Sequence, residues 1–302
     1  MDYKKIIKSR KMRIKILQFL KFIPDKAMVK LQYKIKTGRK LNLKNPTRFT
    51  EKLQWYKLYY RNDLMIRCVD KYDVRKYVED KGLERILIPC YGVYNKFEEI
   101  NIKELPDKFV MKDTLGGGGV SVIIIENKNE TDIEQLKGKA TQWVETPANY
   151  IDDGREWPYY SGKRHRIIIE KLIDSNIDRG GLIDYKFFCF NGEVKFLYVL
   201  ADRVLGNDVA LGIFDRHFQQ LPVYRTDERK LSKTLIKPEK FDEMIDVAEI
   251  LSKNFPHARV DLFFEDNQIY FGEITFFDGS GYMKYEPDDF DEQIGTSFEL
   301  PY

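Results

Sequence analysis

The first 105 residues have the hydrophobic spacing of helices, because their apolar side chains recur every three or four positions. This spacing predicts an amphipathic helix over 50–58. A second helix is predicted over about 63–81 and ends at Gly82, since glycine readily adopts the left-handed conformation that follows a last helical turn. A short strand is expected at 86–88.

From Phe109 onward, continuous apolar runs and turn residues replace the helical spacing. The predicted strands are 109–112, 120–125, 166–170, 186–190 and 194–200. Helices are predicted near 131–145 and 239–255, an Asn-Gly turn at 191–192, and a closing hairpin around 265–267. Because strands and helices mix without regular βαβ alternation, the pattern favours the α+β class over a doubly wound fold.

The composition indicates a folded globular protein, since 43% of the 302 residues are apolar and 14% are aromatic. Three scattered cysteines, Cys68, Cys90 and Cys189, form no C-x-x-C pair, which argues against a zinc site or a disulfide framework. No apolar run approaches the ~20 residues of a membrane span, and the first residues lack a secretory signal pattern. A cytoplasmic location is therefore expected.

The charge is distributed unevenly along the chain. Residues 1–44 contain 15 Lys and Arg against 2 Asp and Glu, whereas the remainder contains 36 against 46. This basic arm has apolar positions near helical spacing, so it fits either a helix that packs on the body or one that contacts an anionic membrane or polymer. Nucleic acid is the least favoured partner, because no recognition motif accompanies the charge.

A lysine and a glycine run form the first candidate binding feature. Lys112 ends an apolar strand and is followed by Gly116, Gly117, Gly118 and Gly119. Such a loop can close over an anion and direct N–H groups toward it, while the lysine adds a fixed positive charge. The same run also fits a flexible hairpin tip, and the P-loop and dinucleotide-binding fingerprints are both absent.

Two acidic residues near the C-terminus form the second candidate feature. If the segment between them is a hairpin with a loop of three or five residues, Arg259, Asp261 and Glu273 share one face. Neighbouring carboxylates repel unless a cation lies between them, and oxygen ligands of this kind suit Mg²⁺ shared with phosphates. The alternative is a solvent-facing acidic pair neutralised by Arg259.

Two further charged pairs complete the pattern. Asp70 and Lys71 are expected at the start of a helix, and Glu170 and Lys171 at the end of a buried strand. Each pair alone is typical of a solvated surface. Their order along the chain, with the glycine loop and the acidic pair, resembles the ATP-grasp superfamily.

More narrowly, the chain is similar to the TupA-like ATP-grasp family, named after a teichuronopeptide biosynthesis protein and found among bacterial surface-polysaccharide genes. The segments that carry the resemblance are Asn45-Pro46, Glu51-Lys52-Leu53-Gln54-Trp55, Asp70-Lys71-Tyr72-x-Val74-Arg75, Leu105-Pro106-Asp107-Lys108-Phe109-Val110-Met111-Lys112 and Asp184-Tyr185-Lys186-Phe187-Phe188-Cys189-Phe190-Asn191-Gly192. The resemblance covers roughly residues 24–285. It implies an ATP-grasp fold with a helical, basic region at 1–105, a small subdomain at 106–173 and a large subdomain at 174–302.

The resemblance also implies an ATP site between the two subdomains. Lys71 and Lys112 are expected to contact the phosphates from two sides, and the loop 116–119 to close over the β- and γ-phosphates. The remaining nucleotide contacts implied are Glu170 at the hinge, the backbone of Lys171 and Ile173 on the adenine edge, and Asp178 on the ribose.

The metal and the chemistry are implied to lie on the last strands. Asp261 and Glu273 are expected to hold Mg²⁺, Arg259 to stabilise the phosphorylated intermediate, and Lys186 to contact a phosphate or the acceptor. Thr275 replaces the Asn common in ATP-grasp ligases, and its hydroxyl can still bind Mg²⁺ or a metal-bound water. One or two Mg²⁺ ions remain compatible with this set.

The activity implied is an ATP- and Mg²⁺-dependent carboxylate–amine ligase that acts through an acyl phosphate. The expected substrates are a sugar acid or glycan and an amine, during capsule or cell-surface polysaccharide assembly, with possible contact to the inner membrane or the polysaccharide machinery. Two other classes stay open, a glycosyltransferase and a non-catalytic nucleotide-binding scaffold. The missing Rossmann fingerprint and isolated Asp-x-Asp motif argue against the first, and retention of all the charged site residues argues against the second.

Overall fold

The computed structural model describes residues 19–117, 121–148, 154–173, 181–202 and 209–301. The helices are α3 (Asp25–Thr37), α4 (Phe49–Tyr59), α5 (Asp63–Cys68), α6 (Asp73–Asp80), α7 (Ile133–Val144), α8 (Phe241–Ser252) and α9 (Phe290–Ser297). The strands are β1 (Cys90–Tyr94), β2 (Phe109–Asp113), β3 (Val122–Ile125), β4 (Ile167–Lys171), β5 (Asp184–Phe190), β6 (Glu193–Ala201), β7 (Ala210–Asp215), β8 (Tyr224–Arg225), β9 (Arg229–Lys230), β10 (His257–Glu265), β11 (Gln268–Thr275) and β12 (Tyr285–Glu286).

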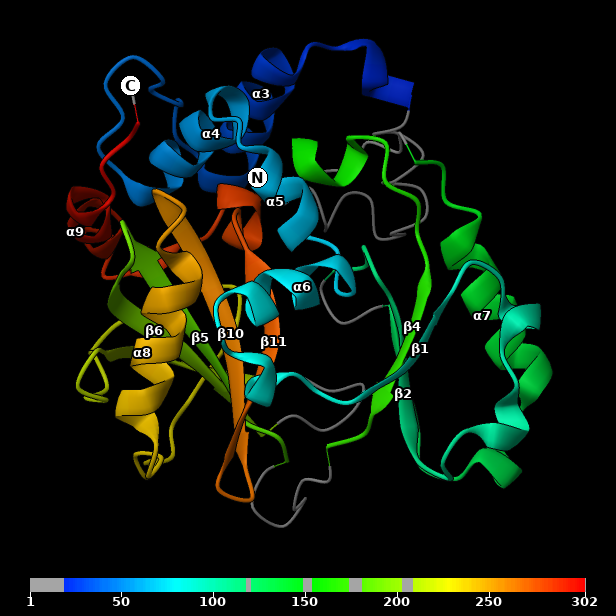
Figure 1. The fold of residues 1–302 in the computed structure, drawn as a ribbon. Helices are drawn as coiled ribbons and strands as arrows, with labels where there is room; N and C mark the ends of the chain where they lie inside the picture. The colour runs from blue at the N-terminus through cyan, green and yellow to red at the C-terminus, as the bar shows by residue number, and fades with distance from the viewer. Residues whose placement is uncertain (1–18, 118–120, 149–153, 174–180, 203–208, 302) are drawn as a thin grey trace.

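Two main sheets divide the molecule into a small and a large unit (Figure 1). The small unit, residues 90–171, contains the sheet β1-β4-β2-β3 and the helix α7. The large unit contains the six-stranded sheet β11-β10-β5-β6-β7-β9, in which only the β7–β9 pair is parallel. The expected α+β class is therefore confirmed, and β1 joins the small sheet although it comes from the region expected to be helical.

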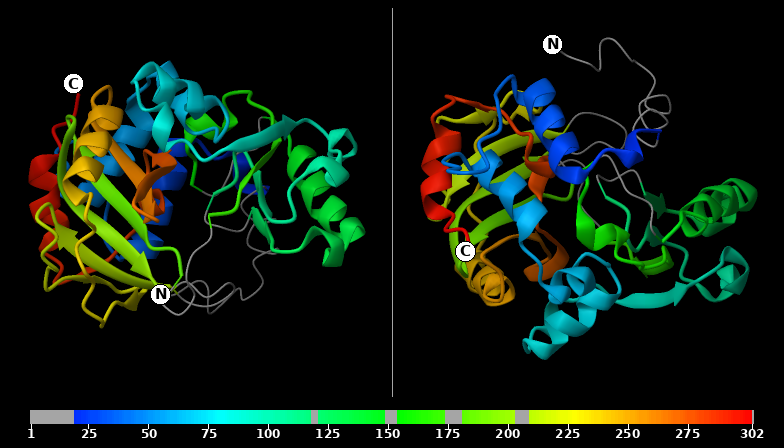
Figure 2. Two further views of the ribbon diagram at one scale, coloured as in Figure 1. Left: turned by 60° about the horizontal axis from the view of Figure 1, so that its bottom comes forward. Right: turned by 90° about the horizontal axis from the view of Figure 1, so that it is seen from above.

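Each unit has its own hydrophobic core. The small core is built from Phe109, Met111, Ile167 and Ile169 of the sheet and from α7. The large core includes side chains of the six-stranded sheet together with helices α4, α5 and α6. The predicted helices after the basic arm are thus part of the large unit, and the two units lie side by side in both views of Figure 2.

The helix predicted over about 63–81 is broken into two. α5 ends at Cys68 and α6 begins at Asp73, because the Asp70 carboxylate accepts the backbone N–H groups of Tyr72 and Asp73 and starts a new helix. The predicted stop at Gly82 is confirmed, since this residue has φ of 70°. The predicted strand at 86–88 is wrong: a 3₁₀ turn, η2 (Glu84–Ile86), precedes Pro89, and the strand starts only at Cys90.

Predictions for the second half of the chain agree better with the structure. Helices α7 and α8 occupy the expected positions. Asn191 and Gly192, with φ of 51° and 80°, form a two-residue turn between β5 and β6. This hairpin fixes the register of β5, which carries Lys186 into the centre of the large sheet.

His257 is a core residue of the large sheet. Its side chain is fully buried and stacks on Phe190 with ring centroids 4.8 Å apart. Its Nδ1 lies 3.0 Å from the carbonyl oxygen of Cys189, so the neutral ring donates there. Burial lowers the pKa of His257 to about 4, which keeps the ring uncharged at neutral pH.

We expect this histidine to make the fold sensitive to mild acid. The unfolded chain takes up a proton near the ordinary histidine pKa whereas the folded protein does not, so the free energy of unfolding falls by about 2 kcal/mol between pH 7 and pH 5. Chemical denaturation across this range should show a flatter pH dependence for His257→Phe. The exposed His217 provides the control, since His217→Asn should keep the wild-type slope; an unchanged slope in His257→Phe would contradict the assignment.

Candidate active site

A buried arginine organises the acidic residues of β10 and β11. Arg259 donates from Nε and Nη2 to the two carboxylate oxygens of Asp261, each at 2.7 Å. The same Nη2 lies 3.1 Å from Glu273 Oε1 and 3.0 Å from Thr275 Oγ1. Nη1 donates to Asp278, just after β11. One guanidinium therefore holds three carboxylates and a hydroxyl in fixed positions.

A β-bulge brings these side chains onto one face. The hairpin loop has only two residues, Asp266 and Asn267, so the predicted loop of three or five residues is wrong. The ladder shifts between Asp261 and Leu262, and Gly272 is the extra residue that restores the predicted pairing of Asp261 with Glu273. A Cβ atom on this glycine would lie only 3.0 Å from the Asp261 carbonyl oxygen.

The two carboxylates differ in their electrostatic environment. Burial raises the pKa of Asp261 to about 6, because the opposing charges of Arg259 and Lys186 only partly offset the loss of solvent. Burial also acts to raise the pKa of Glu273, but the positive charges of Lys71, Arg259 and Lys186 outweigh it and lower the pKa to about 2. Both groups are ionised at neutral pH, and Glu273 stays ionised to a lower pH than Asp261.

Lys186 adds a second cation next to the acidic pair. It pairs with Asp261 across the β5–β10 ladder, and its ammonium contacts both Asp261 and Asp184, the latter at 2.8 Å. Burial acts to lower the pKa of Lys186, but the two carboxylates raise it above its ordinary value. The lysine is therefore charged within the large sheet.

Lys71 approaches the same region from the start of α6. Asp70 beside it is fully buried and accepts a hydrogen bond from Arg166 at 2.9 Å, which fixes the turn. The Lys71 amide donates to the carbonyl oxygen of Thr114 at 2.8 Å, and its ammonium donates to the carbonyl of Gly116. Among the cations that lower the pKa of Glu273, Lys71 acts most strongly, so its charge acts on the acidic pair as well as on the base of the glycine loop.

Lys112 and Glu170 form an ion pair on the small sheet. Glu170 of β4 lies opposite Val110 of β2, two residues before Lys112, so the two charged side chains share one face of the sheet. Lys112 Nζ lies 2.7 Å from Glu170 Oε2. Arg75 of α6 contacts the other oxygen of Glu170 at 3.4 Å and donates to the Ile88 carbonyl at 2.8 Å. Glu170 therefore joins the small unit to the large one.

The predicted adenine contacts lie at the end of β4. The Lys171 amide already donates to the carbonyl oxygen of Pro89 at 2.9 Å, so it is not available to a ligand in this state. Ile173 follows the strand and is half-buried. Gly118, Gly119 and Asp178 lie outside the described residues.

The acidic pair has the donor chemistry that Mg²⁺ prefers. Across the described residues, no three His, Cys, Asp or Glu side chains are grouped as metal ligands. Mg²⁺ in phosphate-binding sites typically takes only one or two carboxylates and completes its shell with phosphate oxygens and water. The Glu273 side chain is 38% exposed, and both of its hydrogen bonds within the described part of the chain go to Oε1. Its Oε2 therefore fits the role of a Mg²⁺ ligand.

The structure also reveals charged residues that the sequence analysis did not assign. Asp184 and Asp278 neutralise Lys186 and Arg259, and Arg75 neutralises Glu170. The two-residue spacing of Asp184 and Lys186 on one strand was a usable signal. For Asp278 and Arg75 no local pattern was available, because their partners are distant in the sequence.

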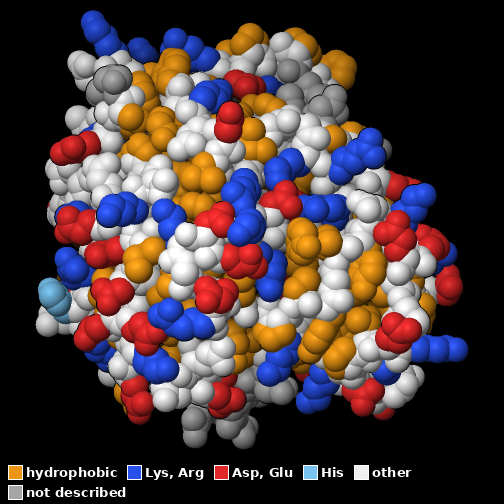
Figure 3. Space-filling model, viewed as in Figure 1, with side chains coloured by type: hydrophobic (Ala, Val, Ile, Leu, Met, Phe, Trp, Pro, Cys, Tyr) orange, Lys and Arg blue, Asp and Glu red, His pale blue; other side chains and the backbone are white. Residues whose placement is uncertain are grey.

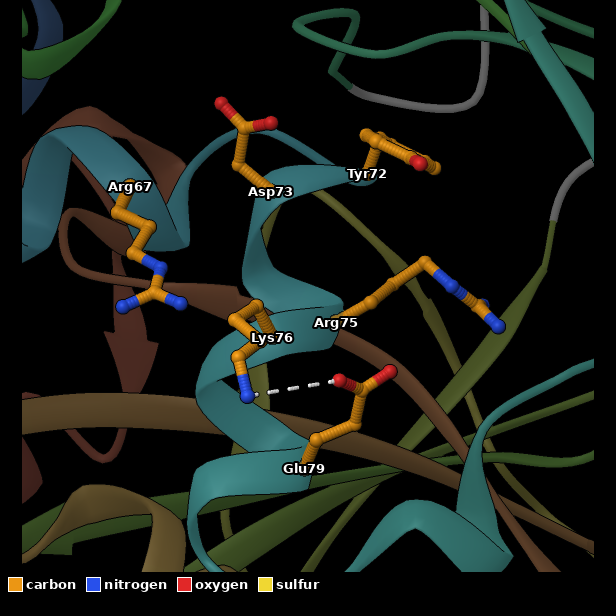
Figure 4. A pocket seen from close by; sticks show the side chains of 6 residues that line it. All are labelled: Arg67, Tyr72, Asp73, Arg75, Lys76 and Glu79. Carbon is orange, nitrogen blue, oxygen red and sulfur yellow. Dashed lines mark ion pairs between the residues drawn. The ribbon is translucent and has the colours of Figure 1, made fainter.

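A pocket of about 470 Å³ lies on α5 and α6. It is lined by Arg67, Tyr72, Asp73, Arg75, Lys76 and Glu79. Figure 4 shows Lys76 facing Glu79, at 3.9 Å, while Arg75 points away from both. The other charged groups of the lining pair with residues outside it, and Arg75 pairs with Glu170 of the candidate site. The lining includes neither Lys71 nor Lys112, so it does not contain the expected phosphate contacts.

A known protein family matches most of the chain. The sequence model described as TupA-like ATPgrasp matches residues 51–299. No curated protein matches the sequence.

Solved structures with a similar fold include D-alanine–D-alanine ligase from Bacillus anthracis, with 20% identity, a TM-score of 0.43, and coverage of 70% of this chain and 57% of that chain. L-amino acid ligase from Bacillus licheniformis gives 17% identity, a TM-score of 0.46, and coverage of 77% and 49%. N5-carboxyaminoimidazole synthetase from Staphylococcus aureus, complexed with ADP, gives 14%, 0.40, and coverage of 78% and 53%. The chain thus spans about half the length of these proteins.

We expect Gly272→Ala to destabilise the protein by about 2 kcal/mol, because the added methyl group forces the bulge apart. Denaturant unfolding measures this change. Gly138→Ala is the matched control: it lies in the exposed part of α7 with no atom within 4 Å of its added Cβ, so it should stabilise the fold by about 0.5–1 kcal/mol. Equal stability of the two variants would show that the bulge tolerates a side chain.

Proposed function

Because the chain belongs to the TupA-like ATP-grasp family, we propose that it is an ATP- and Mg²⁺-dependent carboxylate–amine ligase. The observation that carries the proposal is the convergence of three cations and an acidic pair. The Lys71 ammonium contacts the base of the glycine loop, Lys112 lies on the strand that leads into this loop, and Arg259 fixes Asp261 and Glu273 on β10 and β11. A triphosphate requires such an arrangement of positive charges with a metal-binding carboxylate.

The proposed reaction has two steps. A substrate carboxylate oxygen attacks the γ-phosphorus of ATP, which breaks the bond to the bridging oxygen and yields an acyl phosphate and ADP. An amine then attacks the acyl carbon, an amide forms, and phosphate leaves with the acyl C–O electron pair while the amine loses a proton. ATP is the only energy source required.

The residues of this chain supply positioning and charge. Lys71 and Lys112 are proposed to hold the phosphates, with Gly116 and the following glycines covering them. Asp261, Glu273 and Thr275 are the residues that would hold Mg²⁺, which neutralises phosphate charge when bound. Arg259, oriented by its carboxylates, and Lys186 are proposed to stabilise the negative charge of the acyl phosphate.

The adenosine contacts follow the family pattern. Glu170 lies between the two units and is proposed to sit beside the adenosine, with the Lys171 carbonyl and the Ile173 backbone on the adenine edge. Asp178 is proposed to bind the ribose hydroxyls. The engaged Lys171 amide leaves only the carbonyl of that residue for the nucleotide.

We further propose that the carboxylate belongs to a sugar acid or glycan and that the amine is an amino acid or small amine, in surface-polysaccharide assembly. The support is the family resemblance, since the family is named after a teichuronopeptide biosynthesis protein and is found among bacterial surface-polysaccharide genes.

Nucleotide binding tests the site first. Calorimetric titration of a non-hydrolysable ATP analogue should show binding that is strengthened by Mg²⁺. Glu273→Gln should weaken the metal-dependent part about tenfold or more, because it removes a charged ligand. Lys112→Ala should weaken binding with and without metal, because it removes a phosphate contact.

An exposed ion pair of the small unit provides the matched control. Lys137 and Glu98 lie 2.9 Å apart, away from the site, so Glu98→Gln and Lys137→Ala should bind the analogue as the wild type does. Absence of binding in the wild-type protein would overturn the ligase proposal, and nucleotide sugars would then be tested as the substrates of a glycosyltransferase.

Product formation tests the reaction itself. Uronic acids screened against amines should release ADP and phosphate only when both substrates are present. Arg259→Lys should lower the rate about 10²-fold while the analogue still binds, because loss of the planar fork misplaces the acidic pair and the developing charge. Analogue binding without ADP release from any substrate pair would instead favour the scaffold interpretation.

A further inference from the structure

Helix α3 exposes two adjacent stripes, one of lysines and one of apolar side chains. Lys26, Lys30 and Lys34 recur at intervals of four residues and are all exposed. Beside them, Leu31 and Ile35 are 49% and 41% exposed. The other side of α3 is buried through Met28, Val29, Gln32 and Tyr33, so the two stripes are not needed to attach the helix.

The lysines of this surface lack acidic partners. Residues 19–44 contain eight Lys and Arg but only one acid, Asp25. That carboxylate is already engaged by Arg155 at 2.8 Å and by the Tyr160 hydroxyl at 3.0 Å. Within the described ranges, Lys26, Lys30 and Lys44 form no ion pair. The positive charge is therefore presented to an external partner.

A pocket of about 330 Å³ opens beside the lysine stripe. It is lined by Lys26, Lys30, Leu41, Asn42, Leu43, Lys44 and Tyr59, and no carboxylate is among these residues. The Asn42 side chain accepts the amides of Lys44 and Asn45, at 3.2 and 3.0 Å, which fixes the loop that carries Lys44. Three ammonium groups around a carboxylate-free pocket suit a phosphate group.

Apolar side chains continue along the same edge. Phe19 precedes the 3₁₀ turn η1 (Leu20–Phe22) and Phe22 ends it, and the two side chains are 78% and 75% exposed. Their rings pack edge to face with centroids 6.3 Å apart. Figure 1 places η1 and α3 together along the top of the molecule, the face that is turned toward the viewer in the right view of Figure 2. Figure 3 shows hydrophobic and Lys or Arg side chains side by side along this edge.

We propose that α3 and the loop 41–44 form a docking surface for an anionic phospholipid bilayer. The lysines contact the headgroup phosphates, and one phosphate lies within the pocket. Leu31, Ile35 and the two phenylalanines enter the boundary between headgroups and acyl chains. In the described part of the chain, no helix has the length and apolar character to cross a bilayer. Contact is thus peripheral.

Two other occupants fit this surface less well. A second copy of the chain would place the same lysine stripe opposite itself, and like charges repel. A soluble acidic polymer would pair with the lysines but leave the exposed leucine and isoleucine without a partner. Of these three occupants, the bilayer surface is the one that uses the charge and the apolar stripe together.

Hydrogen bonds link the docking surface to the candidate active site. Arg155 donates to the carbonyl oxygens of Leu20 and Ile23, both at 3.0 Å, and the next residue, Glu156, accepts from the Ser280 hydroxyl at 2.6 Å. Ser280 lies two residues after Asp278, the partner of Arg259.

Vesicle co-sedimentation of the full chain tests the proposal. The wild-type protein should bind vesicles of equal parts phosphatidylcholine and phosphatidylglycerol, bind pure phosphatidylcholine poorly, and dissociate as salt is added. The triple variant K26E/K30E/K44E should bind the anionic vesicles at least about tenfold more weakly. L31S/I35S should weaken binding while leaving its salt dependence intact.

A charge-matched triple variant controls for net charge. Lys96, Lys103 and Lys139 are exposed on the small unit, so K96E/K103E/K139E should keep wild-type vesicle binding. Neither triple variant alters the candidate active site, and circular dichroism with denaturant unfolding checks that each is folded. Because vesicle binding requires no nucleotide, its result is independent of the ligase proposal.

Three outcomes would overturn the docking proposal. The first is equal binding of anionic vesicles by wild type and K26E/K30E/K44E. The second is binding of dextran sulfate, lost in that variant, without any preference for anionic vesicles. The third is a concentration-dependent dimer that L31S/I35S abolishes, again without vesicle binding.

Discussion

The buried guanidinium of Arg259 is the interaction on which the candidate site depends. It brings Asp261, Glu273 and Asp278 within hydrogen-bonding distance of one group, although three carboxylates so close together repel strongly. Removing one partner from such a cluster leaves an uncompensated charge in the interior, which costs far more than the loss of a surface ion pair. The geometry of β10 and β11 at this point is therefore a consequence of charge balance as much as of strand pairing.

Arg225 lies outside the candidate site but takes part in the same charge balance, because it contacts Asp278. Its Nη1 is 3.6 Å from the second oxygen of Asp278, while its other nitrogens bind Asp227. Asp278 is thereby held between two arginines and fixes the far side of the Arg259 guanidinium. Lysine in place of either arginine keeps the charge but loses the planar fork that allows two directions of contact.

The sequence predicted those parts of the site that follow from local pattern or from family resemblance. Lys112 and Glu170 share a face because strands alternate, and a two-residue Asn-Gly turn set the register of β5. Asp261 and Glu273 face each other as expected, but for a different reason: a two-residue loop and the bulge at Gly272 replace the longer loop that simple alternation requires. A bulge of this kind depends on tertiary contacts and has no signal in hydrophobic spacing.

The errors in the fold have the same origin. The pattern over 63–81 has helical periodicity throughout and does not show the break, although Asp70 was expected at the start of a helix. Its carboxylate accepts the amides of Tyr72 and Asp73, and Arg166, distant in sequence, fixes it there. Likewise, the apolar residues 86–88 contribute to the core of the large unit from a 3₁₀ turn and the segment after it, not from a strand. Local propensity identified apolar segments correctly and their backbone conformation less well, since packing decides the latter.

The small sheet borders the large unit through two adjacent strands. These are β1 and β4, its first and last strands along the chain, and they pair directly, with Cys90 opposite Glu170 and the Lys171 amide bound to Pro89. Glu170 lies at this border with Arg75 of α6 on one side and Lys112 of β2 on the other. A single carboxylate therefore couples the charges of the two units, and a change at either of its partners is felt by both.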